Sequence, residues 1–434
     1  MVKPGLGIPK CRIQGVTALS GNNRGIIPSF NIMAKPAGAA CNLDCAYCFY
    51  KNKTQLYPDS SFRMSDKVLE NYIRQTVEAH LLPEVTIGWQ GGEPTLMGLD
   101  FFKKAVALEK KYMRPGMHIE NTFQTNGILI DREWCRFFRE NNFLVGVSID
   151  GPKNLHDVYR RDKGGNGTFE KVFNAIRLMQ EYDVEFNVLC TVNSVNSPHP
   201  LEVYRFFRDS LGAAYIQFIP IVERSHESGG ESVCPPGQSP SPTFFQISER
   251  SVGGVAWGNF LIEIFNEWIR CDVGKVFVLY FDAVLASYMY GRSTSCVLQP
   301  TCGLGVVLEH NGDLYSCDHY VAPEYRLGNI MQDSIQTLLN SEKQKSFGRG
   351  KTEMLPQYCR KCEFLFTCHG ECPKNRVPAT PDGEPDLNWL CEGYKAFFAH
   401  TRVYMETMAA LLRSGKTADE IMGMLDENGN PILP

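Results

Sequence analysis

The chain has 434 residues, which is enough for two or three domains of ordinary size. Its net charge of −4 and its predicted pI of about 6.2 exclude the global positive field of a nonspecific nucleic-acid binder, so we expect no nucleic-acid partner. The amino terminus has no apolar signal segment, and the most apolar stretch elsewhere, Val276 to Tyr290, is short and contains Asp282. We therefore expect a cytoplasmic protein without a membrane partner.

Residues 1–26 are rich in glycine, proline and polar side chains, which predicts a loose amino-terminal extension. After it, short apolar stretches alternate with helical patterns. The expected strands are Phe30–Ala34, Val85–Trp89, Ile119–Gln124, Phe143–Ile149, Val184–Val192 and Tyr215–Ile221. The expected helices are Leu99–Lys111, Arg132–Asn141, Phe169–Tyr182 and Pro200–Ser210. This order predicts an α/β fold of parallel strands with right-handed crossovers, and six units indicate a partial (β/α)6 barrel rather than a closed eight-unit one.

Polar motifs follow the expected strands at their carboxyl ends, where such barrels carry their functional residues. They are a cysteine loop after the first strand, then Gly91–Glu93, Gln124–Asn126, Ser148–Asp150 and Ile219–Val222. Because parallel strands end at one edge, we expect all of these motifs on a single functional rim.

The second half of the chain has a different composition. Residues 225–254 predict a long loop, and a helix is expected from about Trp257 to Cys271. The Asn-Gly pair after His310 predicts a β-hairpin of Val306–His310 and Asp313–Cys317, and about Glu392 to Arg413 is expected to be helical. We divide the chain into an extension, a barrel, a helical linker, a cysteine-rich domain and a carboxy-terminal helical segment, with the limits 1–26, 27–255, 256–295, 296–392 and 393–434.

The distribution of the 16 cysteines indicates metal binding, since clustered thiols in a reducing compartment more often bind metal than form disulfides. Cys41, Cys45 and Cys48 lie in one short loop. A [4Fe–4S] cluster normally takes four thiolates, so three would leave one iron open to a small molecule. A zinc knuckle or a chance cluster also fits, and the spacing alone leaves the choice open.

Eight further cysteines are concentrated in the second half: Cys296, Cys302, Cys317, Cys359, Cys362, Cys368, Cys372 and Cys391. Eight thiolates are enough for two fully ligated clusters, and a pair of zinc sites is the alternative. The other five are scattered, and we expect them to be ordinary small residues: Cys11, Cys135, Cys190, Cys234 and Cys271.

The motifs taken together resemble a known family. The spacing of the first three cysteines, with Tyr47 before the last, resembles the radical S-adenosylmethionine (SAM) signature, and the later cysteines resemble the SPASM extension. The other motifs are Cys48-Phe-Tyr50, Gln90-Gly-Gly-Glu-Pro94, Gln124-Thr-Asn-Gly127, Ser148-Ile-Asp-Gly-Pro152 and Cys317-Asp318. From about Ile32 to Tyr394 the chain is similar to the anaerobic sulfatase-maturating enzymes. This implies a radical-SAM partial barrel, then a SPASM domain and a terminal helix.

The resemblance implies that the open iron binds the methionine part of SAM, which is then cleaved to a 5′-deoxyadenosyl radical. Gly92 matches a position that lets the backbone approach the SAM amino group, and Ser148 and Arg160 match contacts to its ribose and carboxylate. Tyr47 and Val222 also match SAM-contacting positions. Considered without the resemblance, Gly92 fits a plain strand-end turn, Arg160 a solvated side chain and Val222 local packing.

Asp318 matches the base that takes a proton from the substrate after hydrogen abstraction, with a solvated hairpin aspartate as the alternative. Gln90 is a candidate for positioning the substrate, or a structural amide at a strand end. The resemblance also implies three [4Fe–4S] clusters. Two of them would be auxiliary clusters on the sets Cys296, Cys302, Cys317, Cys372 and Cys359, Cys362, Cys368, Cys391, although the spacing permits other groupings.

The implied activity is oxidation of the active-site Cys or Ser of a sulfatase to Cα-formylglycine. The implied partners are an extended segment of the sulfatase polypeptide and an electron donor such as flavodoxin or ferredoxin. The nearest alternative is a SPASM peptide maturase that makes thioether or carbon–carbon crosslinks. The alternative from another class is a zinc-binding scaffold.

Overall fold

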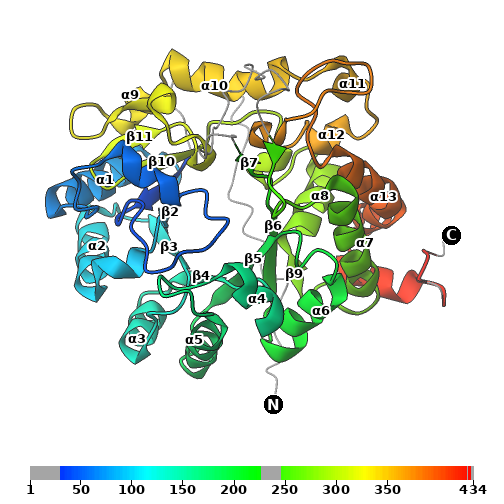
Figure 1. The fold of residues 1–434 in the computed structure, drawn as a ribbon, viewed down its shortest axis with the longest axis horizontal. Coiled ribbons are helices and arrows are strands. Elements are labelled where there is room, and N and C mark those ends of the chain that lie inside the picture. The colour runs from blue at the N-terminus through cyan, green and yellow to red at the C-terminus, as the bar shows by residue number, and fades with distance from the viewer. Residues whose placement is uncertain (1–29, 226–245, 428, 432–434) are drawn as a thin grey trace.

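A computed structural model describes residues 30–225, 246–427 and 429–431. The expected extension over 1–26 and most of the expected loop over 225–254 lie outside the described residues. Figure 1 shows the strands as a curved central sheet with helices around its outer side.

The first part of the chain alternates strand and helix, as expected. Its strands are β1 (Asn31–Lys35), β2 (Glu84–Trp89), β3 (His118–Thr125), β4 (Leu144–Ser148), β5 (Phe186–Val192) and β6 (Tyr215–Pro220). Its helices are α1 (Asp66–Ala79), α2 (Leu99–Tyr112), α3 (Arg132–Glu140), α4 (Lys153–Tyr159), α5 (Phe169–Glu181) and α6 (Pro200–Arg205). The six strands pair in parallel in the order of the sequence, which confirms the partial barrel.

Two helices of the barrel, α1 and α4, were missing from the sequence-based expectation. Helix α1 begins after Ser65, whose side-chain oxygen accepts a hydrogen bond from the N–H of Val68. Leu69, Tyr72 and Ile73 then form part of its buried face. A capping serine followed by apolar residues at helical spacing is the signal that could have found this helix.

The cysteine-rich part continues the barrel sheet. Its elements are β10 (Gly305–Glu309), β11 (Asp313–Tyr315), β12 (Arg326–Asn329), α9 (Ile335–Leu339), α10 (Glu342–Glu353), α11 (Gln357–Arg360) and α12 (Leu365–Cys368). Before it in the chain, the short strand β9 (Phe277–Val278) pairs in parallel with β6 at the other end of the sheet. The expected hairpin is confirmed, with Val307 of β10 opposite Tyr315 of β11. Strand β10 also pairs in parallel with β1, and Lys35 lies opposite Glu309. This pairing brings the ends of two strands far apart in sequence to one place on the rim.

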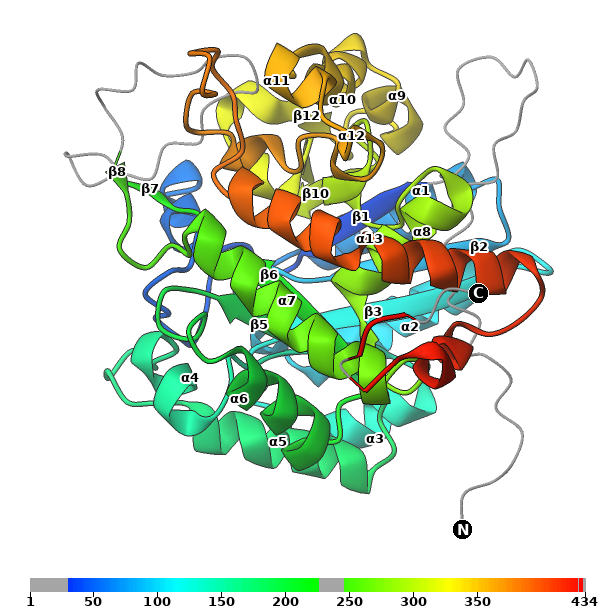
Figure 2. The same cartoon turned by 90° about the vertical axis from the view of Figure 1, so that its right-hand side faces the viewer.

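Long helices cover the remaining side of the sheet: α7 (Gly254–Cys271), α8 (Leu279–Tyr290) and α13 (Cys391–Arg413). Figure 2 shows α13 and α7 together on that side. They approach so closely that a Cβ on Gly258 would lie 2.6 Å from the Cα of Gly393. The short pair β7 (Arg224–Ser225) and β8 (Gln246–Ile247) stands apart from the main sheet.

The core lies between the sheet and the surrounding helices. One part of it is an aromatic cluster in which the Phe123 ring packs against Phe102 and Phe138, with centroids 5.0 Å away in both cases. Within the described ranges 30–225, 246–427 and 429–431, no helix has the length and apolarity needed to cross a lipid bilayer.

Candidate active site and cysteine centres

Cys41, Cys45 and Cys48 lie in the loop that leaves β1 at the rim. One side of the loop is fixed by the segment after α4, because the N–H of Asp44 donates to the carbonyl of Arg161 at 2.8 Å. Burial raises the pKa of the Cys41 thiol to about 12 and that of Cys45 to about 11. Metal binding requires thiolates, and a cationic iron–sulfur core displaces such protons. The three thiols of this loop therefore have the donor chemistry of a cluster, although their side chains are not already arranged around a metal position.

The turn after β2 packs directly against this loop. The N–H of Gly92 donates to the carbonyl of Gly38 at 2.7 Å, and that of Glu93 donates to the carbonyl of Ala40 at 2.8 Å. A Cβ at Gly92 would lie 2.0 Å from the carbonyl oxygen of Ala40, far inside any real contact distance. Glycine is thus required here by the close approach of two backbone segments, and the approach of Gly92 to SAM stays a prediction.

Glu93 joins three of the rim motifs. Its carboxylate is 0% exposed and accepts hydrogen bonds from the Thr125 hydroxyl and from the N–H of Asn126, both at 2.8 Å. Burial raises the pKa of this carboxyl group, and the hydrogen bonds oppose the rise. The Asn126 amide in turn donates to Asn42 in the cysteine loop at 2.8 Å. The sequence analysis gave Glu93 no role of its own, although its motif was noted.

Arg160 and Tyr47 converge on Asp150, just after β4. Arg160 Nε lies 3.0 Å from Asp150 Oδ2, and the Tyr47 hydroxyl donates to the same oxygen. The N–H of Thr191 donates to the other carboxylate oxygen at 3.0 Å. Arg160 is only 7% exposed, so the solvated alternative for this side chain is wrong. Its charge also opposes the rise in the pKa of Cys45 that burial causes.

The remaining predicted rim residues, Ser148, Val222 and Gln90, differ in their hydrogen bonds. The Ser148 hydroxyl accepts a hydrogen bond from the Gln124 amide at 3.1 Å. Val222 is 2% exposed and its carbonyl accepts from the Lys374 ammonium at 3.0 Å, an arrangement that local packing also explains. The Gln90 side-chain oxygen is buried and has no hydrogen-bond partner among the described residues. The contact of Gln90 with a substrate stays a prediction.

Asp318 belongs to a buried charged cluster, so the solvated alternative is wrong here as well. Its Oδ1 lies 2.5 Å from Lys35 Nζ, with the two side chains 12% and 2% exposed. The Lys35 ammonium also lies 4.1 Å from the centre of the Tyr50 ring. The Tyr50 hydroxyl donates to Glu309, the strand neighbour of Lys35. Sequence reasoning missed Lys35, although a charged residue at the end of an apolar strand was a usable signal.

The eight later cysteines lie in two neighbourhoods, although the described residues form no group of three side chains already arranged to hold a metal ion. In the first set, burial raises the pKa of Cys317 and Cys372, and neighbouring thiols of the set raise it further. The second set lines a single small cavity. The first set is Cys296, Cys302, Cys317 and Cys372, and the second is Cys359, Cys362, Cys368 and Cys391. The spacing alone left this grouping open, and the two ligand sets that the resemblance implied stay a prediction.

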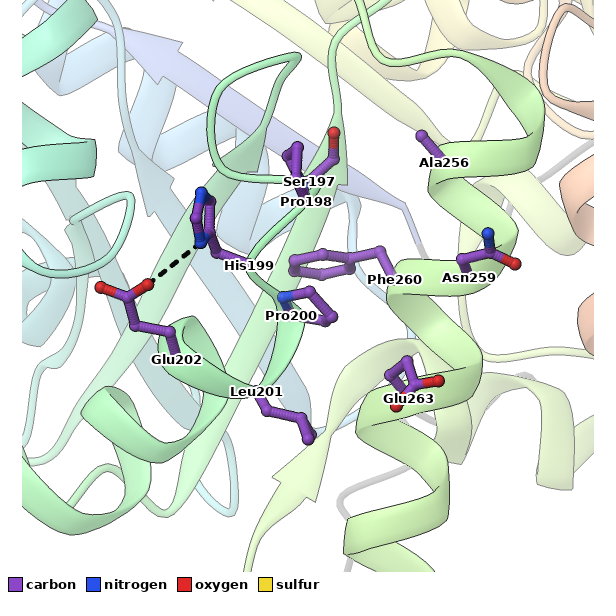
Figure 3. A pocket seen from close by; sticks show the side chains of 10 residues that line it. All are labelled: Ser197, Pro198, His199, Pro200, Leu201, Glu202, Ala256, Asn259, Phe260 and Glu263. Atoms are coloured by element: carbon purple, nitrogen blue, oxygen red, sulfur yellow. Dashed lines mark ion pairs between the residues drawn. The ribbon is translucent and has the colours of Figure 1, made fainter.

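A separate cleft opens between the start of α6 and α7 (Figure 3). His199 Nδ1 and Glu202 Oε2 lie 3.1 Å apart on one side of it, and Phe260 projects from the other. None of the predicted site residues lines this cleft.

Comparison with known proteins identifies the family. The Radical SAM superfamily matches residues 36–207, and the iron-sulfur cluster-binding domain SPASM matches residues 302–363. A serine-type anaerobic sulfatase-maturating enzyme of Bacteroides thetaiotaomicron is 45% identical over 405 residues, or 92% of this chain and 96% of the relative. The chain belongs to the anaerobic sulfatase-maturating enzyme family. A cysteine-type member from Clostridium perfringens is 35% identical over 86% of this chain and 96% of that relative.

Solved structures agree with this membership. Native anSMEcpe with bound AdoMet and Cp18Cys peptide superposes with a TM-score of 0.77 at 33% identity, covering 89% of this chain and all of the other. Streptococcus suis SuiB bound to precursor peptide SuiA, at 14% identity and a TM-score of 0.57, shares the fold. Membership confirms the predicted fold, the SAM and iron–sulfur cofactors and the activity as a sulfatase-maturating oxidoreductase. The zinc-scaffold alternative is wrong.

Proposed function

We propose that this enzyme oxidises the active-site Cys or Ser of a sulfatase to Cα-formylglycine with Asp318 as the base. The observation that carries the proposal is the buried ion pair of Asp318 with Lys35 on the rim. Asp318 directly follows Cys317, a proposed cluster ligand. A base in this place can take a proton from the substrate close to where the electron of the same oxidation leaves.

The cysteine loop is proposed to hold the catalytic cluster through Cys41, Cys45 and Cys48, with the fourth iron open. When bound, SAM and this cluster supply a carbon-centred radical that takes a hydrogen atom from the substrate Cβ. Arg160 would bind the SAM carboxylate, while its contact with Asp150 keeps the guanidinium oriented. The other residues proposed to form the SAM site are Tyr47, Gly92, Ser148 and Val222.

The residues of the chain direct the rest of the oxidation. Once a hydrogen atom has gone, loss of one proton and one electron turns a serine side chain into the aldehyde. A cysteine side chain gives a thioaldehyde, which water converts to the same aldehyde with release of hydrogen sulfide. Asp318 takes the proton, Lys35 holds its carboxylate in one orientation, and the free oxygen of Gln90 accepts a hydrogen bond from the substrate.

The two sets of four cysteines are proposed to hold two fully ligated auxiliary clusters, which when bound provide an acceptor for the electron. We retain the limits 1–26, 27–255, 256–295, 296–392 and 393–434 as proposed regions. Because β10 pairs with β1, the limit at residue 296 separates two kinds of chemistry within one continuous sheet.

The substrate is proposed to be an extended segment of a sulfatase polypeptide, because its reacting Cβ has to reach the proposed SAM site on the rim. The proposed electron donor is a small redox protein such as flavodoxin or ferredoxin, and the proposed location is the cytoplasm. The natural target residue, Cys or Ser, is left to experiment.

Anaerobic reconstitution with iron, sulfide and SAM tests the proposal directly. Peptides with the sulfatase target sequence, one with Cys and one with Ser, are incubated with the reduced enzyme and analysed by mass spectrometry. Formylglycine that reacts with a hydrazide reagent is expected from at least one peptide. A crosslinked product without an aldehyde would instead support the peptide-maturase alternative.

A further inference from the structure

Two cations are buried in the cysteine-rich part without a carboxylate to pair with. Lys351, on α10, is 0% exposed, and Arg376, between α12 and α13, is 4% exposed. Across the part of the chain that the structure describes, neither side chain forms an ion pair. A buried charge without compensation is strongly unfavourable, so each cation needs an explanation.

Backbone carbonyls accept the hydrogen bonds of both side chains. The Lys351 ammonium donates to the carbonyls of Cys296 at 3.0 Å and Val297 at 2.7 Å. The Arg376 guanidinium donates to the carbonyl of Lys351 at 2.8 Å and to that of Gly370 at 3.2 Å. A neutral amide could make such hydrogen bonds without the cost of burying a charge. Hydrogen bonding therefore accounts for the donors and leaves the positive charges unexplained.

The carbonyls that hold these cations belong to the two cysteine sets or adjoin them. Cys296, which accepts from Lys351, is in the first set, and Gly370, which accepts from Arg376, lies between Cys368 of the second set and Cys372 of the first. Burial raises the pKa of Cys296, and Lys351 opposes the rise. Burial also raises the pKa of Cys302, where both Lys351 and Arg376 oppose it. Arg376 has the same effect on Cys359, which belongs to the second set. The backbone contacts place Lys351 beside a proposed ligand of the first set and Arg376 beside the segment that carries a proposed ligand of each set.

We propose that Lys351 and Arg376 are fixed counter-cations of the auxiliary clusters and raise the reduction potentials of those clusters. The inference rests on the proposed ligation of the two cysteine sets. A cluster that gains an electron becomes more negative, so a nearby fixed cation stabilises the reduced form. Weak screening in a buried site strengthens this effect. In this proposal the two residues place positive charge beside the clusters that accept the electron, and they are not substrate-contacting residues.

Glu371 supplies a charge of the opposite sign. It is 3% exposed, and its carboxylate accepts hydrogen bonds from the amides of Asn388 at 2.8 Å and Asn375 at 3.3 Å. It acts on thiols of both sets, since it adds to the rise in the pKa that burial causes at Cys372 and Cys368. Removing its charge should therefore change the potentials in the direction opposite to removal of Lys351.

The experiment is a redox titration of the anaerobically reconstituted enzyme, followed by electron paramagnetic resonance and accompanied by iron analysis. A variant with Cys41, Cys45 and Cys48 replaced by Ala serves as the reference that isolates the auxiliary signals. Lys351→Gln keeps a donor and loses the charge, Lys351→Arg keeps the charge, and Lys345→Met removes an exposed cation of the same helix as a control.

We expect Lys351→Gln to shift the midpoint potential of one auxiliary cluster to more negative values, and Arg376→Gln to shift both. The midpoint potentials of Lys351→Arg and Lys345→Met should stay near those of the unsubstituted enzyme. Those of Glu371→Gln should shift to more positive values. Unchanged potentials in Lys351→Gln with full iron would overturn the inference. If Lys351→Gln loses iron, retention by Lys351→Arg supports the role of charge, and loss in both variants refutes it.

Iron analysis of the unsubstituted enzyme separates this inference from the proposed function. Absence of auxiliary iron would remove the proposed ligation and the inference with it. Normal auxiliary iron and the expected shifts, combined with no formylglycine from either peptide, would leave the inference intact and overturn the proposed function.

Discussion

The rim of the barrel and the cysteine-rich part both place cations beside cysteines, but they treat those cations differently. Arg160 on the rim is paired with Asp150, so its charge is compensated and its side chain is oriented. Lys351 and Arg376 form no ion pair among the described residues, and their donors go to backbone carbonyls in or beside the proposed cluster ligands. A paired cation suits the placement of a ligand, whereas an unpaired one suits control of the charge on a cluster.

The largest effect is expected from the rim cysteines. Replacing Cys41, Cys45 and Cys48 with Ala should abolish SAM cleavage, because the iron that binds SAM is lost. Auxiliary iron should remain, since its ligands lie in the other part of the chain. Chromatographic detection of 5′-deoxyadenosine together with iron analysis checks both points. Loss of all iron would count against separate sites.

The next largest effect is expected from Asp318→Asn, which removes the proposed base and keeps the shape. Formylglycine production should fall by a factor of about 10² or more, the usual contribution of a positioned general base. SAM cleavage should continue, because the rim cysteines are untouched. Product and 5′-deoxyadenosine are measured in the same reaction. Product formation at the normal rate would exclude Asp318 as the base.

A partial loss of iron is expected from Cys359→Ala. This variant removes one ligand of the second set, so about half of the auxiliary iron should be lost and the protein should be less stable, as cluster binding is coupled to folding. SAM cleavage should persist. Iron analysis and thermal unfolding under anaerobic conditions are the measurements. Iron content equal to that of the unsubstituted enzyme would refute the ligand role.

The smallest effect on iron chemistry is expected from Lys35→Met, which should leave iron content and SAM cleavage close to normal. It leaves the Asp318 carboxylate buried without its partner, so we expect about 3–5 kcal/mol of destabilisation and slower formylglycine production. Denaturant unfolding of the double variant Lys35→Met/Asp318→Asn provides the control. Most of the stability should return in that variant, and an equal loss in both would disprove the importance of the ion pair.

The sequence predicted the barrel well because alternating strands and helices leave local patterns. It also placed the correct motifs on one rim, since the ends of parallel strands share an edge. Helix α1 was not predicted, although the Ser65 cap and the apolar positions that follow it are a local signal of the same kind. The solvated alternatives for Arg160 and Asp318 were wrong, because the partners that bury them, Asp150 and Lys35, could not be identified from spacing.

By itself the sequence determined the number and spacing of the cysteines, and its motifs together carried the resemblance that implies an open cluster site followed by ligands for closed ones. Only the tertiary structure decided that Cys359, Cys362, Cys368 and Cys391 line one small cavity. It also decided that Lys35 meets Asp318 and that the Lys351 ammonium meets the carbonyl of Cys296. The physical reason is that strand pairing and chain crossings bring together residues whose distance along the chain carries no information about their contact in space.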